Sequence, residues 1–335
     1  DTSFVTTWET SSANETVTIP TRAEEFAYDY TIDWGDGTTQ SNRTGDATHS
    51  YATAGTYTVS ISGTFPAIAL VNNDFSRGQL RTVERWGNIQ WQTMLDAFRR
   101  VNTLAINAAD APDLSQVTNM ATMFALANNL SGDISDWNVS NVTNMFGMFR
   151  NSPFNYDISG WDVSNVTEMQ RMFDSTPFNQ DISNWDVGNV INMESIFESC
   201  SFNKDIGNWN VGNVTNMRSM FANSSFNQDI GDWNVSNVTT MAVMFDSTPF
   251  NQDINGWNVS NVIDMSFMFI NSSFNQDISA WNVSNVADMR VMFGSTSFNQ
   301  DISSWDVANV ANCLNFANNA PLTAINTPNF TNCTP

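Results

Sequence analysis

The chain has 335 residues, 41% of them hydrophobic, and its 34 acidic against 12 basic residues give a formal net charge of −22. That hydrophobic content can supply a buried core, so composition excludes a disordered chain. A negative charge of this size repels phosphate backbones and anionic lipid head groups, which argues against nucleic acid as a partner. No stretch approaches the roughly 20 apolar residues of a membrane-spanning helix, so we expect no direct membrane insertion.

The start of the chain and its polar composition predict a compartment. The chain begins at Asp1 without a signal peptide, which indicates a processed or excised piece of a longer protein. Few lysines, many asparagines, serines and threonines, and strong acidity suit an extracellular protein. We therefore expect a location outside the cell, and cations or a ligand that carries them as partners.

Residues 1–66 carry short alternating segments divided by turn residues. Residues 30–37 read Y-T-I-D-W-G-D-G, residues 49–51 read H-S-Y, and residues 55–63 read G-T-Y-T-V-S-I-S-G. Alternation of this kind, broken by a Gly-Asp-Gly turn, predicts an all-β, immunoglobulin-like sandwich.

These motifs resemble the PKD domain, an extracellular immunoglobulin-like module, because its W-G-D-G-T and H-x-Y…G-x-Y-x-V signatures are both present. The resemblance implies that His49, the only histidine, belongs to a structural motif, so we expect no catalytic role for it. Asp33 and Asp36 in the same motif are candidate ligands for Ca²⁺, which takes carboxylate oxygens. Residues 67–112, with W-G-N-I-Q-W at 86–91, are expected to form a junction and the N-terminal cap of the array that follows.

A 24-residue repeat fills most of the remaining chain. Its consensus is F-N-x-D-I-S-x-W-[DN]-V-[SG]-N-V-x-x-M-x-x-M-F-x-x-[ST]. The tryptophans of successive repeats are spaced by 24 residues every time: Trp137, Trp161, Trp185, Trp209, Trp233, Trp257, Trp281 and Trp305. A fixed period over this length predicts an array of stacked coils.

Each repeat contains two apparent periods. Residues 229–235 are short and rich in β-branched and aromatic side chains, which predicts a strand. Val238, Met241, Met244 and Phe245 follow at helical spacing, with Ser236 or Asn237 as a natural N-cap. A strand and a short helix in two dozen residues predict a right-handed β/α leucine-rich-repeat-like solenoid of about eight coils over residues 113–316. The expected fold class is therefore mixed, an N-terminal sandwich followed by this solenoid.

The repeated apolar side chains are interpreted as core. Fifteen of the sixteen methionines lie on the two Met positions of the repeat or their N-terminal variant, interleaved with Phe, which favours a flexible packed interior over a copper or promiscuous binding groove. The tryptophans alternate with Ile and Val, which favours burial over an exposed platform for glycan stacking.

An aspartate precedes the inward Ile of every coil, so alternation points its carboxylate outward. Stacked about 4.8 Å apart, such charges repel by roughly 0.9 kcal/mol per neighbour even in water. Backbone N–H groups in the Asn-Gln-Asp turn would offset this repulsion, and so would bound Ca²⁺ or a cationic ligand. The candidate ligand-binding residues are Asp157, Asp181, Asp205, Asp229, Asp253 and Asp277, with Asn208 and Asp232 at the variable position two residues after Ile. Asp205 and Asp229 are also candidate metal ligands.

Two further features of the repeat are given structural roles. The Asn ladder, which includes Asn237, is expected to cap helices and bridge coils. Cys313 and Cys333 bracket the last residues and are expected to form a disulfide that pins a C-terminal cap, residues 317–335. Cys200 occupies a small-residue position of the repeat and is not expected to form a site.

The repeat resembles the BspA-type leucine-rich-repeat surface proteins of bacteria, in the branch with F-N-x-D-I-S-x-W-D-V-S-N-V-T-N-M units. The resemblance implies export, a place on the cell surface or in a large adhesin, and attachment to hosts, matrix or other cells. No nucleophile, metal or cofactor motif stands out, so we expect no enzyme.

The expected function is a non-enzymatic adhesion module that binds a protein, peptide or glycan on its sheet face, as a monomer within a longer chain. A purely structural spacer and, more weakly, an ice-binding surface are the alternatives.

Overall fold

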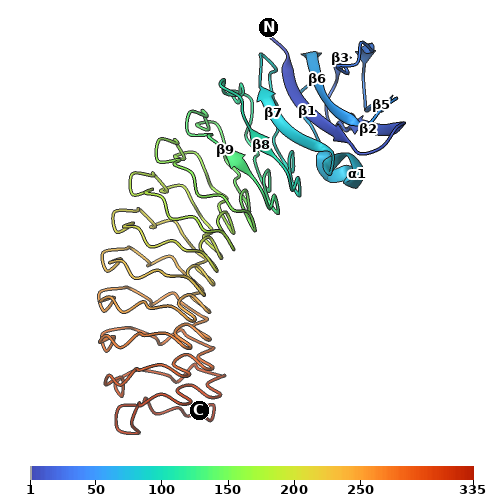
Figure 1. The fold of residues 1–335 in the computed structure, drawn as a ribbon. Helices are drawn as coiled ribbons and strands as arrows, with labels where there is room; N and C mark the ends of the chain where they lie inside the picture. The colour runs from blue at the N-terminus through green and yellow to red at the C-terminus, as the bar shows by residue number, and fades with distance from the viewer. Residues whose placement is uncertain (1) are drawn as a thin grey trace. The chain divides into compact units, whose positions relative to one another are not determined.

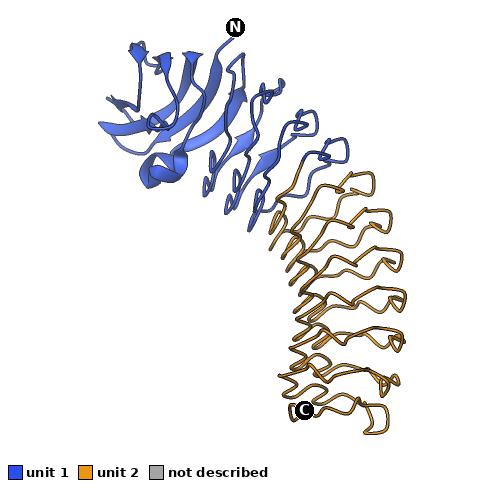
Figure 2. Ribbon diagram, turned by 180° about the vertical axis from the view of Figure 1, so that it is seen from behind, with its two compact units in different colours: residues 1–165 blue, residues 166–335 orange. Residues whose placement is uncertain are grey.

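The computed structural model describes residues 2–335. The described residues form two compact units, 2–165 and 166–335 (Figure 2). No helix among the described residues is long and apolar enough to cross a membrane.

The first unit begins with six strands whose alternate residues are buried. In the first strand Phe4, Thr6, Trp8 and Thr10 all lie inside, because successive side chains of a strand point to opposite faces. The strands are β1 (Phe4–Thr10), β2 (Glu15–Ile19), β3 (Asp29–Asp33), β4 (Thr39–Arg43), β5 (Ala47–Tyr51) and β6 (Gly55–Thr64). The 3-10 helix η1 (Leu70–Asn72), the short helix α1 (Asp74–Arg77), and the strands β7 (Leu80–Arg85), β8 (Ala105–Ile106) and β9 (Ser131–Gly132) follow.

One sheet joins the N-terminal strands to the first coils. Its order is β4-β3-β6-β1-β7-β8-β9, while β2 and β5 pair separately. β1 pairs with β6 and β7 in antiparallel fashion, and β7, β8 and β9 run parallel (Figure 1). The positions expected as domain boundaries, 66 and 112, both lie inside this unit.

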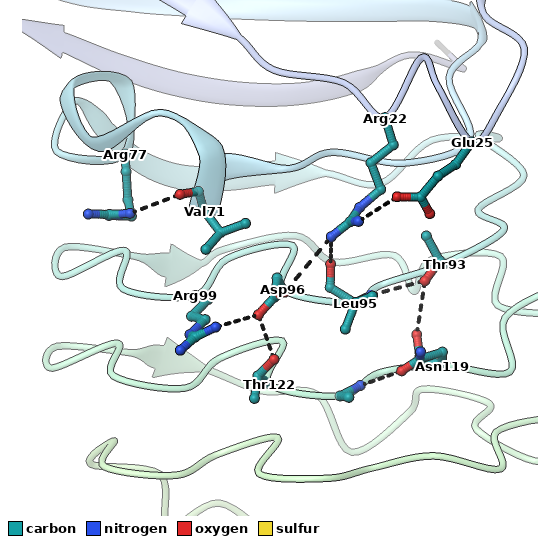
Figure 3. Close-up of polar contacts among 11 residues, drawn as sticks. Arg22, Glu25, Val71, Arg77, Thr93, Leu95, Asp96, Arg99, Asn119 and Thr122 are labelled. Atoms are coloured by element: carbon teal, nitrogen blue, oxygen red, sulfur yellow. Dashed lines mark hydrogen bonds and ion pairs between the residues drawn. The ribbon is translucent and has the colours of Figure 1, made fainter.

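Polar contacts also tie the loop after β2 to the first coils (Figure 3). The Arg22 guanidinium donates to the Leu95 carbonyl at 2.9 Å and lies 4.0 Å from the Asp96 carboxylate. Asp96 in turn accepts the Thr122 hydroxyl at 2.6 Å and pairs with Arg99 at 3.2 Å. Because Asp96 serves three partners from different segments, it fixes the first coils against the N-terminal strands.

The repeats are not the β/α solenoid that the sequence predicts, and this expectation is wrong. Helix covers 2% of the chain, strands and isolated bridges together cover 17%, and both helices of the described residues precede the repeats. Within each unit, the part of residues 113–316 that it contains forms stacked coils of turns (Figure 1), and β9 is the only named strand in that range. Isolated parallel bridges, such as Asn192 with Asn216 and Asn216 with Thr240, link successive coils of the second unit.

The Met segment forms consecutive tight turns instead of a helix. The N–H groups of Met241 and Val243 donate to the Asp264 and Ser266 carbonyls of the next coil, at 3.0 and 2.9 Å. A helix would direct them to carbonyls four residues back. Val243 has a φ of 63°, in the left-handed region, which ends each turn before a helix can propagate.

The segment expected as a strand is also a pair of turns. The Asp229 carboxylate accepts the Gly231 N–H at 2.9 Å, and the Trp233 N–H donates to the Ile230 carbonyl at 3.1 Å. Near this segment a side chain replaces strand pairing, because Asn227 Oδ1 accepts the backbone N–H of Asn251 at 2.9 Å. The sequence pattern of a strand is present, but the coil-to-coil hydrogen bonds of a sheet are not.

The core consists of ladders of identical side chains, as the sequence predicts. In the second unit Phe221, Phe245, Phe269 and Phe293 stack with ring centroids 5.6 to 5.8 Å apart. The eight repeat tryptophans are only 3 to 5% exposed. The interpretation of Trp and Met as core is therefore confirmed, and an exposed tryptophan platform is excluded.

Candidate functional site

A row of exposed carboxylates runs along the coils, and we call it the Asp edge. In the second unit it consists of Asp181, Asp205, Asp229, Asp253, Asp277 and Asp301, all exposed. In the first unit Asp133 and Asp157 hold the same place in their coils. The edge lies on turns, so the expected sheet face does not exist around it.

Backbone N–H groups stabilise the negative charge of the Asp edge. Each Oδ1 accepts the N–H two residues later, at 2.8 to 3.0 Å, as in the pair Asp205 and Gly207. The donors lie downstream of each Asp and not in the preceding Asn-Gln-Asp segment, where we expected them. Hydrogen bonds from the Ser279 and Ser303 N–H groups lower the pKa of Asp277 and of Asp301 below the ordinary aspartate value.

The variable position two residues after each Ile lies beside the Asp edge. Asn208 and Asp232 are exposed, and within residues 2–335 neither side chain makes a hydrogen bond. Both are therefore available to a ligand. The candidate ligand-binding residues of the second unit thus form one exposed strip, as the repeat spacing predicts.

The candidate metal ligands each have protein partners. Asp33 Oδ1 accepts the Gly35 N–H at 2.9 Å, and Asp36 Oδ1 accepts the Thr38 N–H at 3.0 Å. Asp36 Oδ2 lies 2.7 Å from His49 Nε2, and the His49 ring stacks on Trp34 with centroids 5.2 Å apart. Across residues 2–335 no group of three or more His, Cys, Asp or Glu side chains is arranged to hold a metal ion.

The Asn ladder bridges coils but caps no helix. Asn237 Nδ2 donates to the Gly212 carbonyl of the preceding coil at 2.7 Å, and the same bond recurs from coil to coil within each unit. Tryptophan Nε1 groups do likewise, since Trp233 donates to the Ile206 carbonyl at 3.1 Å. These side chains hold the stack together and are not available to a ligand.

The cysteines fall into two environments. A disulfide joins Cys313 and Cys333, the pair predicted from the sequence. Cys200 is buried, 3.4 Å from both the Thr176 hydroxyl and the Phe178 carbonyl. Burial raises the pKa of the Cys200 thiol to about 11, so it stays protonated and unreactive near neutral pH.

Sequence reasoning missed a second surface, the outer side of the Met turns, which we call the turn face. It consists of the exposed and half-buried side chains among the two residues between the Met positions and the residue after Phe. Asp174, Ala242 and Ser266 occupy such places but are buried. In the second unit these places hold all three arginines, Arg171, Arg218 and Arg290. The signal was available, because these positions vary from coil to coil while the core positions barely change.

Comparison with known protein families identifies the repeat. Four overlapping spans of the chain, residues 92–201, 151–249, 175–272 and 222–330, match the family described as “Mycoplasma protein of unknown function, DUF285”. No curated protein and no solved structure matches the chain. The match is consistent with a BspA-type repeat protein. Because the matched spans together cover more than half of its residues, the chain belongs to the DUF285 family.

Proposed function

We propose that the chain is a non-enzymatic binding module on the outside of a bacterial cell, within a longer surface protein or adhesin, and that it binds its ligand along the Asp edge. The observation that carries this proposal is that different residues of each coil hold the stack together and face the solvent. Apolar side chains and the Asn ladder hold the stack, while the Asp carboxylates project from it in an unbroken row over the second unit. A regular exposed row with no part in the core is suited to an extended ligand.

Charge defines the kind of ligand. Residues 166–335 contain 16 acidic side chains and only four basic ones, three of which lie on the turn face. Among the described residues, only Oδ1 of Asp205 and of Asp229 accepts a hydrogen bond, so their Oδ2 atoms can accept from lysine or arginine. The buried tryptophans offer no stacking platform for sugars, which favours a protein or peptide with basic groups over a glycan.

The finer family resemblance supports an extracellular place. In the PKD-like motif the Tyr51 hydroxyl donates to the Trp34 carbonyl at 2.8 Å, and both rings are buried. A packed module of this kind at the front of the repeats is in keeping with the BspA-type branch and with surface export. The protein then acts as a monomer within a longer chain.

The test is to replace Asp205, Asp229 and Asp253 together by Asn. Asn keeps the Oδ1 acceptor, as Asn234 shows by accepting the Ser236 N–H at 3.2 Å in the same coil. The fold should therefore persist while three charges are lost. We expect weaker binding to arrays of basic peptides and an unchanged unfolding temperature.

A charge-matched control removes three exposed carboxylates of the first unit instead, with Glu24→Gln, Asp29→Asn and Asp74→Asn. If both triple variants weaken binding equally, net charge alone attracts the ligand and the Asp edge is not the site. If the wild-type chain binds nothing on protein, peptide or glycan arrays, the spacer function replaces the binding function.

A further inference from the structure

A hollow of about 560 Å³ lies in the first unit, beside the helix α1. On one side it is lined by Asp74 and Arg77 of this helix, and on the other by residues of two successive coils, which include Arg100, Leu126 and Asn128. Its volume falls in the range of small-ligand sites in proteins. The hollow is distinct from the Asp edge, since none of its lining residues belongs to that row.

The two coils at the hollow depart from the pattern of the array. The second residue after each core Phe has a left-handed φ, and in the later coils it is always a short polar residue: Asn151, Ser175, Ser199, Asn223, Ser247, Asn271, Ser295 and Asn319. The first two coils carry Arg100 and Leu126 there, each with a φ of 62°. Long side chains adopt this conformation less readily than Asn. Two such residues kept at one hollow are typical of a functional site.

Arg100 gives the hollow its charge. Its side chain is exposed, and within residues 2–335 its guanidinium makes no hydrogen bond or ion pair. The neighbouring Arg99, by contrast, lies 3.2 Å from the Asp96 carboxylate. Arg77 is also paired, since its guanidinium lies 2.7 Å from the Asp74 carboxylate. Because the paired groups neutralise each other, the guanidinium of Arg100 leaves one positive charge at this hollow, in a chain whose net charge is −22.

Side-chain amides beside this guanidinium have free hydrogen-bonding atoms. Asn128 Nδ2 donates to Asn102 Oδ1 at 3.2 Å, and among the described residues Asn102 Nδ2 and Asn128 Oδ1 make no hydrogen bond. The main-chain carbonyls at the hollow are in use, because that of Gly78 accepts from Arg81 at 2.7 Å and that of Asn102 accepts from Asn129 at 2.8 Å. The hollow therefore offers amide atoms, which suit hydroxyl groups, more than backbone partners, which suit a peptide.

We propose that this hollow binds a sugar residue that bears a carboxylate, such as a uronic acid or a sialic acid. The planar guanidinium of Arg100 pairs with both carboxylate oxygens, the usual geometry of guanidinium and carboxylate. The free amide atoms of Asn102 and Asn128 pair with the sugar hydroxyl groups, and Leu126 contacts the apolar side of the ring. The ligand is acidic, whereas that of the Asp edge is basic, so the test does not depend on the function proposed above.

Two labelled acids test the proposal with the full chain, tri-galacturonic acid and sialyllactose, by fluorescence anisotropy. At least one should bind, and their neutral counterparts, the methyl ester of the first and lactose, should not. Arg100→Asn should lower the affinity by at least about tenfold, because a charge-assisted pair is lost. The fold is retained, since Asn151 occupies the same position with a φ of 53°. Asn102→Asp keeps the Oδ1 acceptor, adds a repelling carboxylate and should lower the affinity at least as much.

Arg218→Gln is the charge-matched control, because it removes one positive charge from the second unit, outside the hollow. It should change the affinity by less than about twofold, since an exposed charge beyond the screening length contributes little. Equal losses in Arg100→Asn and Arg218→Gln would overturn the proposal, and so would equal binding of an acid and its neutral counterpart. A labelled aspartate-rich peptide that binds more tightly than both acids would make an acidic peptide the occupant. Absence of binding by either acid to the wild-type chain would also refute the site.

Discussion

At the scale of single residues, the left-handed positions of the Met turns decide the local structure. One residue in each Met-x-x-Met segment has a positive φ, although most of these residues are not glycine. A left-handed conformation costs about 1–2 kcal/mol for an ordinary residue, and the cost is highest for β-branched ones. The stacked coils tolerate this cost because each turn gains two or more hydrogen bonds to the next coil.

Val243→Asn should therefore raise the free energy of unfolding by about 1 kcal/mol, because Asn adopts the left-handed conformation more readily than Val. Denaturation in urea measures the change. The control is Val235→Asn, at a buried position without a positive φ, which should destabilise the protein. If both variants lower the free energy of unfolding by the same amount, packing and not backbone conformation determines the stability contribution of position 243.

The sequence predicts which residues form the core, but it does not predict the backbone conformation of the Met turns. Met241, Met244 and Phe245 point inward in a helix, and they also point inward in consecutive tight turns, so their burial was predictable while the helix was not. The left-handed positions were hidden, because Val243 and Phe267 do not indicate a positive φ as Gly147 does. The Asp edge was predictable from spacing alone, since every Asp precedes a buried Ile.

At the scale of one coil, the structural element is a series of turns whose backbone polar groups form hydrogen bonds with the adjacent coils. Residues 229–235 have strand-like composition, but the Asp229 and Asn234 side chains accept backbone N–H groups and bend the chain. Side-chain amides then replace sheet hydrogen bonds, as between Asn227 and Asn251. Short polar side chains can form hydrogen bonds with the backbone in place of a sheet partner, and the pattern of hydrophobic residues does not reveal this competition. The strand prediction failed for this reason.

The tryptophan of each coil should be its most sensitive position. Trp209 is 3% exposed and donates to the Ile182 carbonyl of the preceding coil at 3.1 Å. Trp209→Ala should lower the free energy of unfolding by about 3–5 kcal/mol, as a large-to-small core change. Trp209→Phe keeps most of the volume and leaves the carbonyl unpaired, so it should cost about 1–3 kcal/mol. Acrylamide quenching of most indoles in the folded protein would contradict this account.

At the scale of the whole molecule, the two ends of the array are covered differently. At the front, β7, β8 and β9 extend the N-terminal sheet into the first coils. At the back, residues after 316 supply the partners that a further coil would supply: the Ile302 N–H donates to the Asn326 carbonyl at 3.0 Å, and Phe330 packs edge-on against Phe316 at 5.0 Å. Terminal coils need such covers, because they would otherwise expose core side chains.

The Cys313–Cys333 disulfide should hold the rear cover in place. Closing a loop of this length stabilises by about 3 kcal/mol in the chain-entropy treatment. Mass spectrometry of a non-reduced digest should recover the linked peptide. Cys313→Ser with Cys333→Ser should increase hydrogen exchange in residues 302–335 while leaving residues 205–253 protected. Two free thiols in the native protein would show that the cap is held without the bond.

The recurrence of the same coil-to-coil hydrogen bonds allows whole repeats to be gained or lost in the gene. Each middle coil of the second unit offers its neighbours the same donors and acceptors, so the bond from Asn237 to Gly212 recurs from Asn261 to Ser236. Loss or duplication of one 24-residue unit by recombination between similar repeats would preserve the recurring hydrogen bonds of the Asn ladder and would interrupt no core ladder. The array can therefore lengthen or shorten in single steps, and with each step a lineage shifts a turn-face residue such as Arg218 or Leu314 along the surface. A change in the number of repeats would alter the residues exposed on the turn face and leave the fold of each coil unchanged.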